Sequence, residues 1–573
     1  MSNAVFSQLL TDIADLLELK AENVFRIRAF RRASEVIKAL PHDIVSLDRA
    51  SQLLIPGIGK GISDMIEEFK KEGHINELEK LKKEFPAGLL ELMNLEGLGP
   101  KRAAHLFHDL KIDSLQKLKA AAESGKLLQV PGFGEKLQET LLKSIAYQSQ
   151  TGHRLLLPNA RRFADEIKTY LSKSPSIKQV ELAGSARRWK ETVGDLDFLC
   201  ASTQPEKAIA HFIQAPTVER VLAQGATKAS VMLKTGLQCD FRVVEAASFG
   251  AALVYFTGSK EHNVRLRELA QKKGFTLNEY GLFKLTDTEK KHPVAGRTEE
   301  DVYEHLGLPW IPPELREDRG EIEAGLENRL PHLVTMNDVK GDVHNHTTLS
   351  DGIATMEEMV AAAAEKKWEW YFCGDHSPSL KIAGGLPPEI LAKKKQDIQR
   401  FMEHQKRINV FLGSEVDILS DGKLDYSDEV LNTIDCVVAS VHSQFKQPVD
   451  LMTARICRAM ENPHVDIIGH VSGRLLNKRH GYDVNYDALL EKAKETQTAL
   501  EINGQPDRLD LSDVFVKRAV ERGVPLVLSS DAHQTSDLDN VEWALHVARR
   551  GWAEPQHILN CLKTEEILRW LNR

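Results

Sequence analysis

The chain has 573 residues, of which 42% are hydrophobic, and this is enough for several packed domains. No apolar run approaches the ~20 residues of a membrane-spanning helix, and the first residues lack a secretion-signal pattern. Six cysteines without paired spacing indicate a reducing, cytoplasmic environment. The net charge of −8 argues against a globally basic nucleic-acid binder, so any contact with DNA must depend on local geometry.

Two helices are predicted at the start of the chain. In residues 6–19 the apolar side chains recur with the 3.6-residue period of an amphipathic helix. A second helix, residues 23–40, carries Arg26 and other arginines around Phe30. These arginines form either a solvated basic face or a pocket for the 5′-phosphate of DNA, and the sequence leaves both interpretations open.

Glycine turns follow, each placed before a helical stripe of apolar residues. Glycine permits the positive φ that lets backbone amides point outward together at a helix start. Such a helix-hairpin-helix can hold a DNA phosphate without reading the base sequence. One Gly-x-Gly turn is often only a tight turn, but its recurrence along residues 53–142 indicates a repeat. The glycines expected to contact DNA are Gly57, Gly59, Gly97, Gly99, Gly132 and Gly134.

Two aspartates, Asp195 and Asp197, open a strand predicted at residues 196–200. Side chains alternate along a strand, so these two carboxylates point the same way. Carboxylates this close repel each other unless cations lie between them, and hard oxygen ligands favour Mg²⁺ or Mn²⁺. The alternative is an aspartate pair that is merely solvated at a strand end.

A turn that can hold phosphate lies upstream of this pair. Gly184 and Ser185 break a strand predicted at residues 180–183. Their backbone amides can bind a phosphate group, with Arg187 and Arg188 close by. The sequence therefore favours a site that combines paired metal ions with a triphosphate.

A third aspartate stands in the middle of a later apolar strand. Residues 237–244 are predicted to form this strand, with Asp240 at its centre. A carboxylate buried alone there would be costly. A position beside Asp195 and Asp197 on one sheet would remove that cost through shared metal ions.

The segment GSARRWKETVGDLD, residues 184–197, resembles the nucleotidyltransferase motif of family X DNA polymerases, the group that includes DNA polymerase beta. The resemblance covers residues 5–317 and implies that Asp195, Asp197 and Asp240 are the catalytic, metal-binding carboxylates. It also implies a set of residues that bind the deoxynucleoside triphosphate. These are Gly184, Ser185, Arg188, Gly194, Tyr255, Phe256, Gly258 and Asn263.

The segment YFTGSKEHNVRLR, residues 255–267, carries further family features. By resemblance, Tyr255 and Phe256 form a wall that leaves no room for a 2′-hydroxyl, so deoxynucleotides are selected. Ser259 is predicted to cap the next helix, with Asn263 toward the nucleotide and Arg267 toward the template DNA. An ordinary exposed helix is the alternative.

The chain departs from the family pattern at two positions. Lyase-competent members carry a lysine after the first hairpin, where Met65 stands here. Because a thioether is not an amine nucleophile, we expect no Schiff-base lyase activity. The family's arginine two residues before the proline that opens the palm is also absent, since Leu156 precedes Pro158. Some triphosphate contacts must therefore differ.

Beyond an acidic linker predicted at residues 318–337, predicted strands and helices alternate, and the strands end in polar residues. This rhythm is typical of a parallel βα barrel with its site at one mouth. A single histidine there is more often packed or exposed than a ligand, but many at one end of a sheet indicate a metal cluster. The predicted ligands are His344, His346, Asp351, His376, Glu415, His442, His470, Asp531 and His533.

This constellation resembles the polymerase and histidinol phosphatase (PHP) domain, over residues 338–570. The ligands exceed the needs of one metal, and imidazole-rich ligation favours two or three ions of Zn²⁺, Mn²⁺ or Fe²⁺. Such ions would activate water and hold a phosphodiester. Arg474 is a further candidate for holding phosphate, and a surface arginine is the alternative.

The expected architecture is multidomain: all-α helix-hairpin-helix domains, an α/β nucleotidyltransferase palm with a thumb, and a C-terminal distorted (β/α)7 barrel. The expected boundaries are 1–80 for an N-terminal helical DNA-binding domain, 81–152 for a helix-hairpin-helix or fingers domain, 153–248 for the palm, 249–317 for the thumb, 318–337 for the linker and 338–573 for the PHP domain.

The expected function is a DNA-directed DNA polymerase that fills short gaps in base-excision repair. The PHP domain would add a metal-dependent 3′-5′ exonuclease and abasic-site incision. The partners would be gapped or primer–template DNA and deoxynucleoside triphosphates, without a membrane, and the lack of a heptad pattern favours a monomer. Two alternatives are a DNA-holding module for a phosphoesterase, opposed by the carboxylate trio, and a template-free RNA nucleotidyltransferase, opposed by the DNA-type hairpins.

Overall fold

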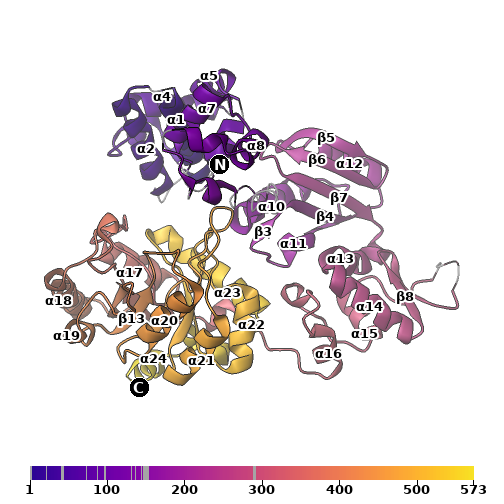
Figure 1. The fold of residues 1–573 in the computed structure, drawn as a ribbon. Helices are drawn as coiled ribbons and strands as arrows, with labels where there is room; N and C mark the ends of the chain where they lie inside the picture. Colours follow the sequence, from indigo (N-terminus) through magenta and orange to yellow (C-terminus); the bar gives the residue numbers. More distant parts are fainter. Residues whose placement is uncertain are drawn as a thin grey trace. The chain divides into compact units, whose positions relative to one another are not determined.

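The fold was analysed in a computed structural model (Figure 1), which describes residues 3–572 except 21, 40–43, 73, 87, 94, 96, 97, 131, 136, 143, 144, 146–153, 288, 290 and 291. The chain divides into two units, residues 1–152 with 477–479 and residues 153–476 with 480–573. Each unit is described by itself. Among the described helices, none combines the length and the apolar character needed to cross a membrane.

The first unit is built from short helices that share one apolar core. Its helices are α1 (Asn3–Leu19), α2 (Val24–Ala39), α3 (Arg49–Leu53), α4 (Lys60–Glu72), α5 (Asn76–Glu84), α6 (Gly88–Met93), α7 (Pro100–Leu110) and α8 (Leu115–Glu123). Ile13 of α1, Ile66 of α4 and Leu106 of α7 are fully buried in that core. The two helices predicted at the start of the chain are α1 and α2.

Glycine turns precede helices in this unit, as the repeat predicts. Gly57 has φ +102° before α4, and Gly132 has φ +85° before helical residues at 137–142. Glycine adopts this conformation without the steric cost that a side chain adds. Gly99 is the N-cap residue of α7. Gly97, the other glycine predicted in that turn, lies outside the described residues.

The second unit begins with a five-stranded sheet, the palm, in the order β2-β4-β7-β6-β5. Its strands are β2 (Gln179–Leu182), β4 (Asp195–Ala201), β5 (Val218–Gln224), β6 (Lys228–Leu233) and β7 (Gln238–Val244). Strands β4 and β7 are parallel neighbours, while the other neighbouring pairs are antiparallel. Apolar residues of α10 (Leu157–Leu171) and α12 (Pro205–Ile213) join the core of this sheet. A short pair, β1 (Leu155–Leu156) and β3 (Thr192–Val193), lies beside α10.

The thumb follows the palm in the chain. It consists of α13 (Phe249–Thr257), α14 (Lys260–Lys272), the hairpin β8 (Phe275–Asn278) with β9 (Gly281–Lys284), and α15 (Glu299–His305). The predicted linker at 318–337 is not a free connection, because it contains α16 (Glu321–Leu326). Glu321 is fully buried and accepts a 2.6 Å hydrogen bond from Nδ1 of His262 in α14. The acidic composition therefore reflects, in part, a buried contact with the thumb.

The C-terminal half is a seven-stranded sheet in which every neighbouring pair is parallel and the strands follow chain order. Its strands are β10 (Gly341–Asp342), β11 (Trp370–Cys373), β12 (Asn409–Asp417), β13 (Cys436–Ser440), β14 (Ile467–Ile468), β15 (Ala499–Asn503) and β16 (Leu526–Ser529). The helices that alternate with them are α17 (Met356–Glu365), α18 (Pro388–His404), α19 (Asp428–Leu431), α20 (Val449–Met460), α21 (Tyr486–Thr496), α22 (Asp513–Arg522), α23 (Val541–Arg550) and α24 (Thr564–Leu571).

The first and last strands of this sheet are joined through one side chain. Asn560 is fully buried and donates hydrogen bonds to the carbonyls of Gly341, 2.8 Å away, and Leu528, 2.9 Å away. A parallel bridge between Asn345 and Ala532 links the segments that follow these strands. The sheet is thus a nearly closed barrel, and the predicted (β/α)7 architecture is confirmed.

Candidate functional site

The three palm aspartates lie on one side of two neighbouring strands. Asp197 of β4 is in register with Asp240 of β7, and Asp195 is in register with Gln238. The alternate residues of both strands, such as Phe198 and Phe241, are buried in the core. The structure therefore brings the predicted carboxylates to the face of the sheet opposite the core.

The surroundings of Asp197 disfavour its negative charge. Burial, together with the charges of Asp195 and Asp240, raises the pKa of Asp197 to about 7. Gly184, which has φ +62°, packs directly on this side chain, because a Cβ at Gly184 would lie 2.2 Å from the Asp197 Oδ2 atom. A glycine is thus required beside the carboxylate.

Asp240 is held by groups of its own sheet. It accepts a 2.9 Å hydrogen bond from Gln238 and forms a 3.0 Å ion pair with Lys228. Burial alone would raise the pKa of Asp240, but the hydrogen bonds from Gln238, Lys228 and Ser230 hold it below its usual value. The three aspartates do not form a group whose ligand atoms all lie within 4.8 Å of one another, as three groups of described residues elsewhere do.

The two arginines of the GSARR turn contact the segments after the palm. Arg187 makes two 2.8 Å hydrogen bonds to the carboxylate of Glu299 in α15. Arg188 pairs with Glu317 at 2.9 Å and donates to the carbonyl of Thr257. Both guanidinium groups therefore tie the nucleotide-binding turn predicted from the sequence to the thumb and the segment after it.

Asn263, one of the predicted nucleotide-binding residues, holds the turn at the end of α13. The Asn263 side-chain amide donates to the carbonyls of Tyr255, 2.7 Å away, and Gly258, 3.3 Å away. A Cβ at Gly258 would meet the Asn263 Oδ1 atom at 2.6 Å. Ser259 caps α14 by accepting from the backbone of His262, so this predicted cap is confirmed.

The aromatic pair on α13 and the predicted template contact lie near this turn. The rings of Tyr255 and Phe256 meet edge to face, and the guanidinium of Arg242 lies 4.5 Å from the Phe256 ring centre. Arg267 is exposed on α14 and donates to the backbone carbonyl of Asn263. Arg267 therefore presents its guanidinium at the surface of the helix that holds the α13 turn.

Arg154 is a palm residue that the sequence reasoning did not single out. Its guanidinium donates to the Thr192 side chain at 2.9 Å and to the Thr192 carbonyl at 2.6 Å. A Cβ at Gly194 would lie 2.9 Å from one of its terminal nitrogens. The absence of a side chain at Gly194 thus leaves room for the Arg154 guanidinium beside Thr192. The only sequence signal was an arginine close to Pro158.

In the first unit, one predicted DNA contact must be corrected. The side chain of Phe30 is only 5% exposed because it belongs to the apolar core of the helices. Arg26 is half-exposed and pairs with Glu77 at 2.7 Å. The spacing of Phe30 with Ile27 and Ile37, which are also buried, is the helical period that could have assigned it to the core.

The mouth of the barrel gathers the predicted metal ligands into three overlapping groups. They are His346, Asp351, His376 and His533; His344, His346 and Asp531; and His376, Glu415 and His442. The predicted ligand His470 lies outside these groups, but its Nε2 atom is 2.9 Å from Glu415. Apart from Asp351, which lies in the loop between β10 and α17, each ligand stands in or shortly after a barrel strand, where the carboxyl ends of parallel strands meet.

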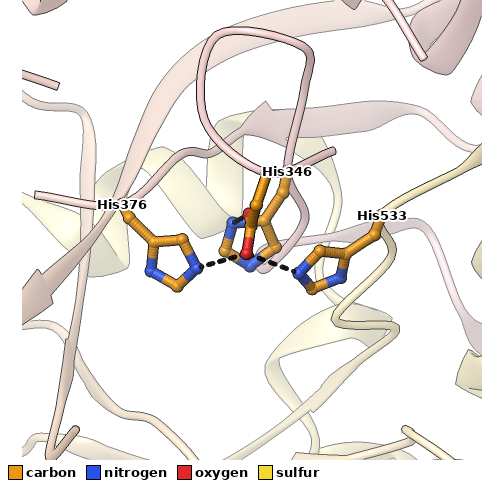
Figure 2. A group of neighbouring side chains, drawn as sticks. His346, His376 and His533 are labelled. Carbon is orange, nitrogen blue, oxygen red and sulfur yellow. Dashed lines mark ion pairs between the residues drawn. The ribbon is translucent and has the colours of Figure 1, made fainter. Parts of the chain in front are cut away.

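His346 is at the centre of the first group. Its ring lies between those of His376 and His533, with ring centres 4.2 and 4.3 Å apart (Figure 2). Nε2 atoms of His376 and His533 each lie 3.4 Å from the same oxygen of Asp351. Burial alone would raise the pKa of Asp351, but these two histidines hold it well below its usual value.

Glu415 is a buried carboxylate with several of the histidine ligands around it. It is 2% exposed, and its carboxylate lies 2.8 Å from His376 and 3.2 Å from His442. Burial would raise the pKa of Glu415, but the surrounding histidines hold it far below its ordinary value. His470 and Asp531 reach the cluster from backbone positions with φ +24° and +49°. Such conformations in non-glycine residues concentrate at functional sites.

Ring nitrogens in this cluster fit a metal site. Nε2 of His344, both ring nitrogens of His346 and Nδ1 of His376 are buried and make no well-aligned hydrogen bond among the described residues. Carboxylate oxygens lie close to them without that alignment, as Glu415 does 2.8 Å from Nδ1 of His376. A buried polar atom without a partner is costly. Imidazole nitrogens and carboxylate oxygens arranged in this way are the donor set of divalent transition metals.

Comparisons with known proteins agree with these two sites. Family models match for a helix-hairpin-helix domain at residues 1–75, a SAM-like helix-hairpin-helix tandem at 89–146, the DNA polymerase beta thumb at 252–317 and a PHP domain at 342–505. The chain is 38% identical to the DNA polymerase/3′-5′ exonuclease PolX of Bacillus subtilis, over 99% of this chain and 98% of that protein. The chain belongs to the PolX family.

Two further relatives each cover part of this PolX-family chain. DNA polymerase lambda of Rattus norvegicus is 26% identical over 53% of this chain and 56% of its own length. A probable phosphatase of a Thermoanaerobacter species is 29% identical over 38% of this chain and 89% of its own length. The family X resemblance and the PHP resemblance predicted from the sequence are confirmed.

The sequence did not reveal the carboxylates of this PolX-family chain that accept hydrogen bonds from the barrel histidines. Glu501 accepts a 2.6 Å hydrogen bond from His344, and Asp417 accepts one from His442. A carboxylate on the second ring nitrogen fixes the orientation and protonation of a metal-binding histidine. The available signal was the acidic residue inside each of the apolar strands β15 and β12.

Arg474, the predicted phosphate-holding arginine, contacts the palm and a loop of the barrel. Its guanidinium pairs with Glu191 of the palm at 2.7 Å and donates to the backbone carbonyls of Arg508 and Leu509. The side chain is 16% exposed. These contacts hold a loop of the barrel, and the phosphate-holding role of Arg474 stays a prediction.

Proposed function

We propose that this PolX-family chain is a DNA polymerase and 3′-5′ exonuclease that fills short gaps during DNA repair and trims or incises DNA with its barrel. The observation that carries the proposal is the presence of two separate acidic or histidine-rich centres in one chain. Asp195, Asp197 and Asp240 share one face of the palm, and the histidine cluster fills the barrel mouth. Base-excision repair is the process that would need both activities.

In the palm, we propose that Asp195, Asp197 and Asp240 hold Mg²⁺ or Mn²⁺, which would stabilise the charge that builds up on the α-phosphate. The primer 3′-oxygen bonds to the α-phosphorus, the bond to the β-phosphate breaks, and pyrophosphate leaves while the hydroxyl loses its proton. Asp240, which lies beside Asp197, is the carboxylate that we assign to the side of the primer 3′-hydroxyl.

Several side chains would position the nucleotide. The turn at Gly184 and Ser185 would bind the triphosphate through its amides, and Gly194 would let the nucleotide come close to the backbone before Asp195. Arg188 would contribute by exchanging its partner Glu317 for phosphate. Tyr255 and Phe256 would form the wall against the sugar, with Asn263 holding the turn behind them, and Arg267 would contact the template.

We propose that the helical domains bind DNA through the glycine turns. Backbone amides around Gly57, Gly59, Gly99, Gly132 and Gly134, and Gly97 by sequence, would each contact phosphate without reading bases. Arg26 would contribute once its pair with Glu77 opens. The proposed division of the chain keeps the sequence boundaries: 1–80, 81–152, 153–248, 249–317, 318–337 and 338–573.

In the barrel, we propose that two or three ions, Zn²⁺, Mn²⁺ or Fe²⁺, are held by the histidine cluster and supply an activated water for phosphodiester hydrolysis. The residues that would hold them are His344, His346, Asp351, His376, Glu415, His442, His470, Asp531 and His533. Abasic-site incision would use the same ions, since hydrolytic incision also breaks a phosphodiester bond of the DNA backbone.

Separation of function tests this proposal. Asp240→Ala should abolish primer extension on a 5′-labelled gapped duplex and leave degradation of the 3′ end unchanged. His344→Ala should have the opposite effect on the same substrate. Extension by Asp240→Ala at near the wild-type rate would show that the palm assignment is wrong.

A further inference from the structure

Arg508 lies next to the metal-ligand cluster, in the loop between β15 and α22. Its Nε atom is 3.6 Å from Oδ2 of Asp531, and Asp531 forms one of the ligand groups with His344 and His346. The side chain of Arg508 is 23% exposed. The guanidinium is therefore at the barrel mouth, close to the proposed ions but still open to solvent.

The guanidinium of Arg508 has donors to spare. Among the described residues no hydrogen bond from its side chain is found, and its one ion pair is the contact with Asp531. An arginine has five N–H donors in a planar fork. Arg474 is different, because Glu191 and two backbone carbonyls already occupy its donors. Arg508 is thus the arginine at this mouth that can accept a new anionic partner.

The loop around Arg508 is fixed from two sides. Arg474 donates to the carbonyls of Arg508 and Leu509, and Leu509 is buried with φ +41°. On the other side, the Gln505 side chain donates to the carbonyl of Asp531 at 2.6 Å and its own carbonyl accepts from the Arg508 amide at 2.8 Å. The backbone that carries Arg508 is therefore held close to Asp531.

Nearby carboxylates stabilise the positive charge of the half-buried Arg508. Burial alone would lower the pKa of Arg508, but the carboxylates of Asp531 and Glu415 raise it above its usual value. Arg508 in turn adds to burial in lowering the pKa of His470. The guanidinium thus faces the same carboxylates that would bind the ions.

We propose that Arg508 binds the non-bridging oxygens of the scissile phosphodiester at the barrel mouth, an inference that rests on the proposed nuclease function. Its planar fork matches two phosphate oxygens, which a point charge cannot do as well. The water oxygen bonds to phosphorus, the bond to the 3′-oxygen of the preceding nucleotide breaks, and that oxygen ends with a proton from the water. Arg508 stabilises the negative charge on phosphate through this change.

The competing role for Arg508 is to orient Asp531 as a ligand. The two roles differ in what is lost when the guanidinium is removed. A substrate-binding arginine affects the binding of phosphate and the hydrolysis rate but leaves the ions in place. An arginine that only positions Asp531 affects the ions themselves, because a ligand of the cluster would lose its support.

The test uses the full-length chain loaded with Mn²⁺ and the variants Arg508→Gln and Arg508→Lys. The control is Arg518→Gln, which removes the same charge from α22, where Arg518 pairs with Asp487. Five quantities are measured: metal content, 3′-5′ hydrolysis of a labelled single strand, inhibition by inorganic phosphate, calorimetric binding of inorganic phosphate, and primer extension.

Arg508→Gln should lower kcat/KM for hydrolysis by about 100-fold, the usual effect of removing one donor to a developing charge. Phosphate should inhibit and bind about tenfold more weakly, while metal content and extension stay at wild-type levels. Arg508→Lys should fall between the wild type and Arg508→Gln, and Arg518→Gln should match the wild type.

Unchanged phosphate binding in Arg508→Gln would overturn the inference, and so would a loss of metal that accounts for the whole defect. If the wild-type chain shows no hydrolysis at all, the proposed nuclease function fails separately. The calorimetric titration then still decides, since weaker phosphate binding by Arg508→Gln supports the inference and equal binding contradicts it.

Discussion

The palm carboxylates and the barrel histidines are both placed by parallel strands, but their surroundings differ. In the palm, Asp195 is exposed and Asp240 is bonded to Lys228 and Gln238. In the barrel, Glu415 is buried among histidines, and Glu501 fixes the ring of His344. We infer that the barrel ligands are in place before ions bind, whereas Asp240 must leave its partners when the palm is loaded.

This difference fits the number of metal ligands that each substrate supplies. A triphosphate supplies oxygen ligands of its own, so a Mg²⁺ site can rely on a few carboxylates and the substrate. A phosphodiester near an activated water supplies fewer, so the protein must hold the ions between turnovers. Buried histidines with carboxylate partners are suited to that task.

The largest difference between the two sites is expected from His346→Ala. His346 belongs to two of the three ligand groups, so its loss should remove metal and reduce hydrolysis by more than about 100-fold. Extension should remain. Metal analysis and a 3′-end degradation assay measure this, with His404→Ala as the control, since His404 is exposed and its Nδ1 atom bonds to the Arg400 carbonyl of its own helix. Retained metal and hydrolysis would mean that the cluster is not the nuclease centre.

A large effect of the opposite kind is expected from Gly184→Ala. The new Cβ would lie 2.2 Å from Oδ2 of Asp197 and must displace that carboxylate. A displacement of this size costs about 100-fold in rate, so extension should fall by that factor while hydrolysis is unchanged. Gly225→Ala is the matched control, because a Cβ there would lie at an ordinary 3.5 Å from the carbonyl oxygen of Lys228. Equal extension rates for both variants would contradict the placement of Asp197.

An intermediate effect is expected from Glu501→Gln. The neutral amide would weaken the hydrogen bond from Nδ1 of His344 and so lower metal affinity by about 10–100-fold. A competition titration with a metal indicator measures the affinity, and Glu495→Gln, at an exposed residue of α21, is the control. An unchanged affinity would show that the barrel does not depend on its supporting carboxylates.

The smallest effect is a pH-dependent stability change in Asp197→Asn. The pKa of Asp197 is raised from 3.8 to about 7, so the folded state holds the proton more tightly than the unfolded state. Stability of the metal-free chain is therefore lost as pH rises from about 4 to 7, and the neutral amide avoids this loss. In chelator, the variant should melt about 2–4 °C higher at pH 8 and equally at pH 4. A variant that melts lower at pH 8 would contradict the repulsion among the palm carboxylates.

The sequence carried the main features of both sites because each depends on a local pattern. The alternation around Asp195 and Asp197 fixed their common face, and an aspartate inside an apolar strand pointed to Asp240. In the barrel, polar residues at the ends of successive strands identified the ligands, since the ends of parallel strands meet. These patterns follow from strand geometry alone.

The partners of the cationic side chains could not be found in this way. Arg188 pairs with Glu317, and Arg474 pairs with Glu191, both across more than a hundred residues of chain. No periodicity links such residues, so a guanidinium near a phosphate-binding motif was assigned to phosphate. Arg508 has no motif at all, and its position became visible only when the loop was placed beside Asp531.

We expect the ligand cluster of the barrel to be formed before its ions bind, and the metal site of the palm to be completed by its nucleotide. Anomalous diffraction from crystals grown with Mn²⁺, with and without a non-hydrolysable deoxynucleotide and gapped DNA, tests this claim most directly. We predict peaks beside His346 and Glu415 in both crystals, and a peak between Asp197 and Asp240 only when the nucleotide is present. Palm peaks of equal strength without nucleotide, or an absence of barrel peaks, would contradict the claim.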